Sequence, residues 1–160
     1  MIRPIAAAVA GALALTSPAA AQTVARTYAA PASPIAQTVT VPAGFETIYL
    51  SGVLPDLPKP PAPPADAEVQ AESVFAKIAA ILKGRGLTEG DVVSMTIYMT
   101  GGEAGARMDF PGMMRAYLKH YGTPEQPNKP TRSTVQVAAL AAPGALLEVE
   151  VTAVRRAGNP

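Results

Sequence analysis

Two segments of the chain repeat apolar residues at the spacing of an amphipathic helix. The first begins near Asp66, a residue type that caps helix N-termini, and is ended by Gly84. Gln70 and Lys77 lie away from its apolar stripe, which consists of Ala71, Val74, Phe75, Ile78 and Leu82. The second helix is predicted over roughly 109–121, with a stripe formed by Phe110, Met113, Met114, Tyr117, Leu118 and Tyr121.

Other segments have the alternation or the β-branched content of strands. These segments are 38–41, 45–50, 91–100, 132–140 and 145–155. The order of strands and helices predicts an α+β fold, a two-layer sandwich in which two helices cover one face of a mixed sheet. We expect a homo-oligomer to cover the second face, because the strands supply further apolar residues, namely Val93, Val135, Val137, Val149 and Val151.

The first 21 residues have the pattern of a secretory signal peptide. Arg3 precedes an apolar run at 5–15, and Ala19 and Ala21 form an A-x-A cleavage site. The run is shorter than the about 20 residues that a membrane-spanning helix needs. We therefore expect cleavage after Ala21 and a location in the periplasm or outside the cell. Residues 22–33 would then be a flexible leader, and 157–160 a short tail after the domain at 34–156.

Composition excludes several classes of function. The chain has no cysteine, one histidine (His120) and a formal net charge of +1. Disulfides, thiol nucleophiles, cysteine-ligated zinc and multi-histidine metal sites are therefore excluded. A near-neutral chain without a basic run has no electrostatic footprint for nucleic acid. His120 itself is predicted to be a helix-capping or surface residue.

The segment 54–64, LPDLPKPPAPP, is dense in proline. Neither a helix nor a central strand can run through it, so it is predicted to be an extended surface loop. Recognition by a partner that binds proline-rich ligands is the alternative interpretation.

Two charged residues stand out on apolar strands. Arg132 shares a strand face with Thr134, and Glu148 alternates with apolar neighbours. An arginine fork suits a carboxylate, and a carboxylate near it could activate water. The same pattern is also typical of a solvated sheet face. A hairpin centred near Pro143 would place Arg132 opposite about Val154, roughly 20 Å from Glu148, so spacing alone does not create a site.

Five blocks of sequence carry a resemblance to a known family: YLSG at 49–52, GLTEGDVVSMTIYMT at 86–100, DF at 109–110, PTRSTVQVAAL at 130–140 and LLEVEVTAVRR at 146–156. Over about 34–156 the chain resembles the Rid (RidA, YjgF-type) family of reactive-intermediate deaminases. The resemblance implies a chorismate-mutase-like α+β fold and a homotrimer with sites in the clefts between subunits. It also implies that the last strand is not beside the strand of Arg132.

The resemblance also implies roles for individual residues. Arg132 takes the place of the arginine that binds the substrate carboxylate, and Glu148 that of the glutamate that positions the attacking water. Ser51 and Gly52 match the loop whose backbone lines the pocket.

Three positions depart from the family pattern. Thr134 stands where the family has a cysteine, Ile35 where it has a tyrosine, and Met114 where it has an asparagine. The turn at 141–144 is one residue longer than usual. The predicted pocket wall is therefore more apolar than that of the family.

The function that the resemblance implies is hydrolytic deamination of 2-enamino or 2-imino acids to 2-oxo acids and ammonia, as in 2-iminobutanoate/2-iminopropanoate deaminases. The expected partners are a small 2-imino or 2-oxo acid and two further copies of the chain. No metal, organic cofactor, nucleic acid or, after cleavage, membrane is expected. The alternative is a non-catalytic periplasmic trimer that binds small carboxylates or acts as a holdase-like chaperone.

Overall fold

A computed structural model of the chain describes residues 23–57, 66–103 and 105–158. The predicted signal peptide at 1–21 and most of the proline-rich segment lie outside the described residues. The elements, in chain order, are β1 (Ala25–Thr27), β2 (Thr38–Thr40), β3 (Phe45–Val53), α1 (Ala67–Lys83), the 3-10 helix η1 (Glu89–Asp91), β4 (Val92–Met99), α2 (Phe110–His120), β5 (Thr131–Gln136) and β6 (Leu147–Arg156).

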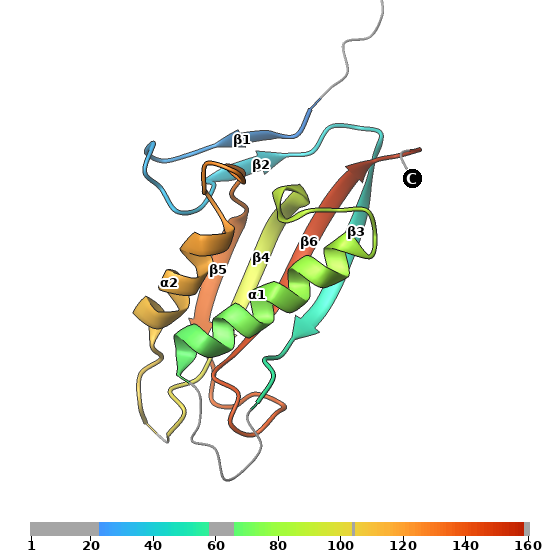
Figure 1. The fold of residues 1–160 in the computed structure, drawn as a ribbon. Helices are drawn as coiled ribbons and strands as arrows, with labels where there is room; N and C mark the ends of the chain where they lie inside the picture. Colours follow the sequence, from blue (N-terminus) through green and yellow to red (C-terminus); the bar gives the residue numbers. More distant parts are fainter. Residues whose placement is uncertain (1–22, 58–65, 104, 159–160) are drawn as a thin grey trace, which may run out of the picture.

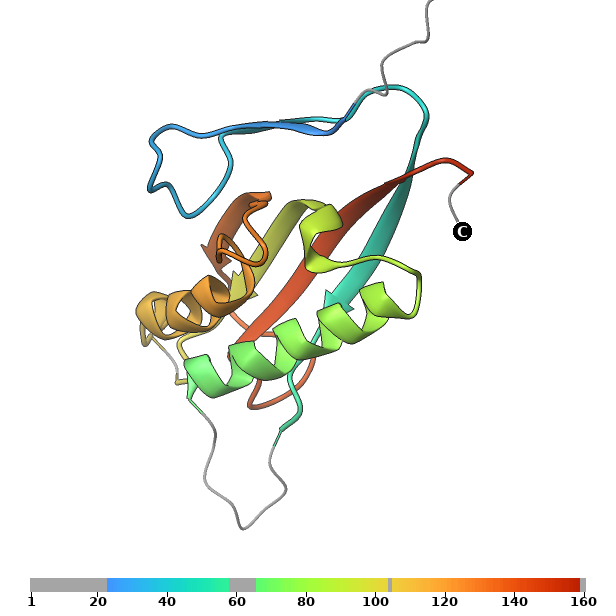
Figure 2. The ribbon, with the colours of Figure 1, turned by 45° about the horizontal axis from the view of Figure 1, so that its top comes forward.

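The main sheet has four strands in the order β3-β6-β4-β5. The β4–β5 pair is parallel and the other pairs are antiparallel, so the sheet is mixed. Both helices lie on the same side of this sheet, and the β1–β2 ribbon lies at one end (Figures 1 and 2). The predicted two-layer α+β sandwich is confirmed, and β6 is separated from β5 by β4.

Helix α1 forms where the sequence predicts it. The carboxylate of Asp66 accepts a hydrogen bond of 2.9 Å from the backbone N–H of Val69, which caps the N-terminus. All five residues of the predicted stripe are buried. In α2 the stripe is only partly right, because Leu118 is 52% exposed on the side away from the core.

Gln70 corrects the prediction for α1, because it is buried and not on a polar face. Its side chain is 1% exposed. Its Nε2 donates to the carbonyl of Gly144 at 3.0 Å, and its Oε1 accepts from the N–H of Leu146 at 2.8 Å. The first turns of α1 thus pack against the turn before β6 and supply hydrogen-bond partners to two of its backbone groups.

The uncovered face of the sheet is polar along β4 and β6, which corrects the expected apolar second face. Val149 and Val151 pair with Ile97 and Met95 on the side of the helices, and all four are buried. The alternate positions of β4 and β6 form the other face: Ser94, Thr96, Tyr98, Glu148, Glu150 and Thr152. The strand register therefore assigns Val149 and Val151 to the helix-covered core. Val135 pairs with Tyr98 and is 43% exposed on the other face, where Val137 lines a cavity with Tyr98 and Glu148.

Two predicted boundaries also change. The predicted leader contains a strand, since Ala25–Thr27 pairs with β2 and the Arg26 side chain donates to the carbonyls of Gly90 and Val92 at 3.1 and 3.2 Å. The strand predicted at 132–140 ends at Gln136. These ends depend on tertiary hydrogen bonds that local composition does not encode.

Candidate active site

Arg132 lies on β5, the edge strand of the sheet, and its side chain packs against α2. Its Nη2 donates to the Sδ of Met114 at 3.1 Å. Its Cζ lies 4.3 Å from the centre of the Tyr117 ring and 5.8 Å from that of Phe110. The guanidinium is therefore held by aromatic faces and a thioether, which fix its orientation while leaving donors for another group.

The unfilled hydrogen-bonding groups around Arg132 point to a missing acceptor. Its Nη1 is buried without a hydrogen-bond partner among the described residues, and so is the Oγ1 of Thr134, two residues along the same strand face. Burial lowers the pKa of Arg132, although the nearby Tyr117 acts in the opposite direction. A buried cation with an unused donor is costly, and an anionic ligand would relieve that cost.

Glu148 lies on β6, on the uncovered face, directly opposite Tyr98 of β4. Its carboxylate lies over Gly52, where the β3–β6 register is shifted, and a Cβ added at Gly52 would overlap it. Glu148 also borders a cavity of about 230 Å³ lined by Tyr98, Val137, Ala139, Leu140 and Ala141. This carboxylate therefore has room beside it for a water or a ligand.

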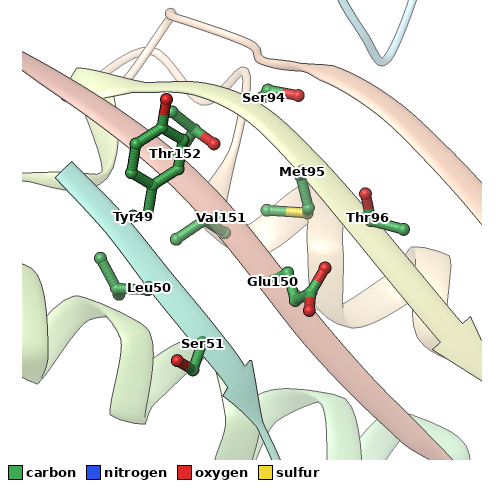
Figure 3. Close-up of a pocket in the computed structure, with 9 residues that line it drawn as sticks. All are labelled: Tyr49, Leu50, Ser51, Ser94, Met95, Thr96, Glu150, Val151 and Thr152. Carbon is green, nitrogen blue, oxygen red and sulfur yellow. The ribbon is translucent and has the colours of Figure 1, made fainter. Parts of the chain in front are cut away.

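Ser51 borders a second cavity on the same face, drawn in Figure 3. This cavity of about 310 Å³ has Tyr49, Thr96, Glu150 and Thr152 among its lining residues. Glu150 accepts a hydrogen bond of 3.2 Å from the Tyr98 hydroxyl, and this bond is the main cause that raises the pKa of Tyr98. Glu150 is thus engaged by a neighbour within the chain.

The predicted site residues fall into two groups on opposite sides of the sheet. Arg132 pairs with Met95 and so faces the helices, whereas Glu148 pairs with Tyr98 and faces away from them. Strand geometry gives the two Cα atoms a separation of about 14 Å. One chain therefore does not bring the two charged groups together.

Met114 and Ile35 lie on the side of Arg132. Met114 contacts Arg132 directly, and Ile35 packs against the hydrophobic core. The segment of Ile35 is held beside α2 and β5, because Pro34 O accepts from the Tyr117 hydroxyl at 3.0 Å and the N–H of Ala36 donates to Pro130 O at 2.9 Å. We name Arg132, Thr134, Met114 and Ile35 the arginine half-site, and Glu148, Ser51 and Gly52 the glutamate half-site.

The sequence pattern does not reveal two residues that contact the arginine half-site. Tyr117 and Phe110 were assigned only to the apolar stripe of α2, yet both rings face the guanidinium. Burial raises the pKa of Tyr117 to about 12, so the ring stays neutral beside Arg132. Their spacing of seven residues on one helix was the available signal, but it does not identify the strand that the helix meets.

His120 is not the surface or capping residue that was predicted. Its ring is mostly buried and bonds Glu89 at 2.8 Å and Glu72 at 3.1 Å, next to the Phe75 ring. It therefore joins η1 and α1 to the end of α2. Within the part of the chain that the structure describes, no group of three or more His, Cys, Asp or Glu residues is placed to hold a metal.

Comparison with known proteins decides the family. The sequence model of a family described as Endoribonuclease L-PSP matches residues 27–155. The chain belongs to this family, the Rid (YjgF/RidA) family. The match includes every residue of both half-sites. It begins at Thr27, the last residue of β1, within the predicted leader.

Relatives named as deaminases are similar over about two thirds of the chain. TdcF of Escherichia coli (strain K12), named as a candidate reactive intermediate deaminase, is 36% identical over 110 residues, 69% of this chain and 80% of TdcF. The 2-iminobutanoate/2-iminopropanoate deaminase of the same organism is 33% identical over 109 residues, 68% of this chain and 80% of that protein. The crystal structure of E. coli TdcF with bound serine superposes with a TM-score of 0.55 at 34% identity and covers 72% of this chain and 84% of TdcF.

Among the described residues, no helix combines the length and the apolar character that a membrane crossing requires.

Proposed function

We propose that this Rid protein hydrolyses 2-imino acids, and the 2-enamino acids that tautomerise to them, to 2-oxo acids and ammonia. The observation that carries the proposal is the arginine half-site. A buried guanidinium with an unused Nη1 stands beside the unpaired hydroxyl of Thr134. This pairing suits a ligand that has a carboxylate and a polar atom next to it. The deaminase names of the relatives and the serine bound to TdcF support a small amino-acid-like ligand.

The active site would be shared between two copies of the chain. Arg132 and Glu148 face opposite sides of their own sheet, so a single copy cannot present both to one small molecule. A second copy can place its glutamate half-site against the arginine half-site at the β5 edge. We therefore propose a homotrimer, the closed assembly of the family, in which each of the three interfaces completes one site.

In this site Arg132 would bind the substrate carboxylate throughout the reaction. Glu148 would accept a proton from a water as the water oxygen bonds to the imine carbon, and the C=N double bond would become a single bond. Glu148 would then return the proton to the nitrogen. The hydroxyl proton of the tetrahedral carbinolamine would then pass to the nitrogen, with Glu148 as its carrier, as the C=O bond forms and the C–N bond breaks to release ammonia. No redox change and no cofactor enter this sequence.

The non-catalytic alternative is favoured by the three positions at which the chain differs from the family pattern, namely Thr134, Met114 and Ile35. A trimer could keep Arg132 as a carboxylate-binding group without turnover. The description of the family also names an endoribonuclease, but a net charge of +1 without a basic run does not favour RNA as the ligand. For location, we propose export and cleavage after Ala21, which intact-mass measurement of periplasmic protein would test.

The test of activity generates imines in place with an amino-acid oxidase and follows the loss of semicarbazone formation when the protein is added. The wild type should accelerate that loss. Glu148→Gln should lower turnover by about 10²–10⁴ while keeping 2-oxobutyrate binding, because the carboxylate acts on water and not on the bound acid. Absence of acceleration by a folded wild type that still binds 2-oxobutyrate would establish the non-catalytic alternative.

A further inference from the structure

The wall beside Arg132 is built from three side chains of α2. Phe110, Met114 and Tyr117 occupy positions i, i+4 and i+7, which lie in one row on a helix. All three reach the guanidinium group: the Sδ of Met114 is 3.1 Å from Nη2, and the rings of Tyr117 and Phe110 lie 4.3 and 5.8 Å from Cζ. A molecule bound through its carboxylate to Arg132 would therefore have this row beside it.

The strand face that carries Arg132 offers few polar groups to a substrate side chain. Thr134 has one unpaired hydroxyl, which the substrate nitrogen or carboxylate can use. Gln136, the next residue on that face, is engaged at both ends of its amide. Its Oε1 accepts from the N–H of Met108 at 3.0 Å, and its Nε2 donates to Ala106 O at 2.7 Å. A polar substrate side chain would therefore lose its water here without gaining a partner from Gln136.

We propose that the site selects 2-imino acids with a large apolar side chain, such as the imine of leucine, and that Met114 and Phe110 set this preference. The inference rests on the proposed function and specifies its substrate class. The unbranched thioether of Met114 can adapt to side chains of different shape. Phe110 is 37% exposed, so it has surface left for a ligand to cover. Each methylene that such a wall covers changes selectivity by roughly 10- to 200-fold.

Binding of two 2-oxo acids tests the preference independently of turnover. Calorimetric titration should show the wild-type protein binding 4-methyl-2-oxopentanoate about tenfold or more tightly than pyruvate. Met114→Asn should bring this ratio to about one, whereas Met114→Leu should preserve it because it keeps the apolar volume. Leu118→Asn is the matched control, since it makes the same kind of change on the same helix at a side chain that is 52% exposed and is not among those described against the guanidinium, and it should leave the ratio unchanged.

Phe110→Ser provides a second variant in case Met114→Asn does not fold. Phe110 is in the first turn of α2 and partly exposed, so its loss threatens the core little, and the ratio should fall severalfold. Equal binding of both acids by the wild type, binding of neither, or an unchanged ratio in the folded wall variants would overturn the proposal. The imine assay separates the two ideas. A retained preference without hydrolysis refutes the deaminase function alone, and hydrolysis with equal binding refutes the preference alone.

Discussion

Arg132 and Glu148 stand on opposite faces of one β-sheet, although both lie within the C-terminal strands. The register places Arg132 level with Met95 and Val151, two strands away, and Glu148 lies three residues along β6 from Val151 on the other face. The two groups therefore differ in surroundings as well as position. Arg132 is enclosed by α2, whereas Glu148 borders an open cavity beside Gly52. Variants of the two half-sites should fail in different ways.

Removal of Arg132 should strongly weaken ligand binding. A bidentate, charge-assisted contact contributes about 1.5–3 kcal/mol. Arg132→Ala should therefore weaken 2-oxobutyrate binding by about ten- to over a hundredfold. Arg132→Lys should recover little, because an ammonium cannot reproduce the fork that rests on Tyr117. Calorimetric titration measures both. Equal affinity of wild type and Arg132→Ala would overturn the assignment of the arginine half-site.

Gly52 should tolerate no side chain if the glutamate half-site is functional. A Cβ at this position would overlap the Glu148 carboxylate, which must then move. Gly52→Ala should lower turnover by an order of magnitude or more, because a small displacement of a positioned group is costly. Circular dichroism should show that the fold is retained. Gly84→Ala is the matched control, since Gly84 has φ −63° and an added Cβ there meets its nearest neighbour at 3.5 Å. Equal activity of both variants would contradict the proposed position of Glu148.

The cluster around His120 should make stability depend on pH. Its pKa is raised, chiefly by the hydrogen bond to Glu89 and further by Glu72, while burial acts against the rise. Glu72 is itself bridged to Lys119 at 2.6 Å, and the Phe75 ring packs on the imidazole. A raised pKa in the folded state means that the stabilisation is fully present below the unfolded value of about 6.5 and is lost as pH rises through the folded pKa.

The measurement is urea unfolding at several pH values from about 6 upward. The wild type should lose stability as pH rises, and His120→Gln should remove that slope. Arg155→Gln is a suitable control, because it breaks a surface ion pair with Glu46 at 2.9 Å without touching the histidine. An identical slope in wild type and His120→Gln would show that the imidazole does not titrate between these carboxylates.

Local patterns predicted the elements, and long-range contacts decided the rest. The apolar period of α1 predicted the burial of Val74, Phe75 and Ile78, because residues three or four apart in the sequence lie on the same face of a helix. Gln70 was misassigned because its partners lie more than seventy residues away. Alternation correctly separated Val149 from Glu148, but it could not indicate which of the two faces meets the helices.

The candidate site also has a part that the sequence predicts and a part that depends on tertiary packing. Arg132 and Glu148 were identified by their chemistry and by the family resemblance, whereas spacing left their relation open. The contact of Tyr117 with Arg132 follows from the packing of α2 against the β5 edge, which no local pattern contains. β1 was missed because Ala25–Thr27 is too short to show a period, and Arg26 anchors it to distant carbonyls.

The composite nature of the site can be tested by mixing two inactive variants. Arg132→Ala keeps an intact glutamate half-site, and Glu148→Gln keeps an intact arginine half-site. Each alone should be nearly inactive in the imine assay. If the variants are unfolded together and refolded as a mixture, some interfaces will join the intact half-site of one chain to that of the other.

With equal amounts and random assembly, activity should return to about a quarter of the wild-type value, because each half-site is intact in half of the chains. The control mixes Arg132→Ala with the double variant Arg132→Ala/Glu148→Gln, which contains no Arg132 and should stay inactive. Differently tagged chains recovered in one complex would verify that mixing occurred. Mixed complexes whose activity does not exceed that of the separate variants would place Arg132 and Glu148 in sites within a single chain. The geometry of the sheet, with the two residues on its opposite faces, argues against that result.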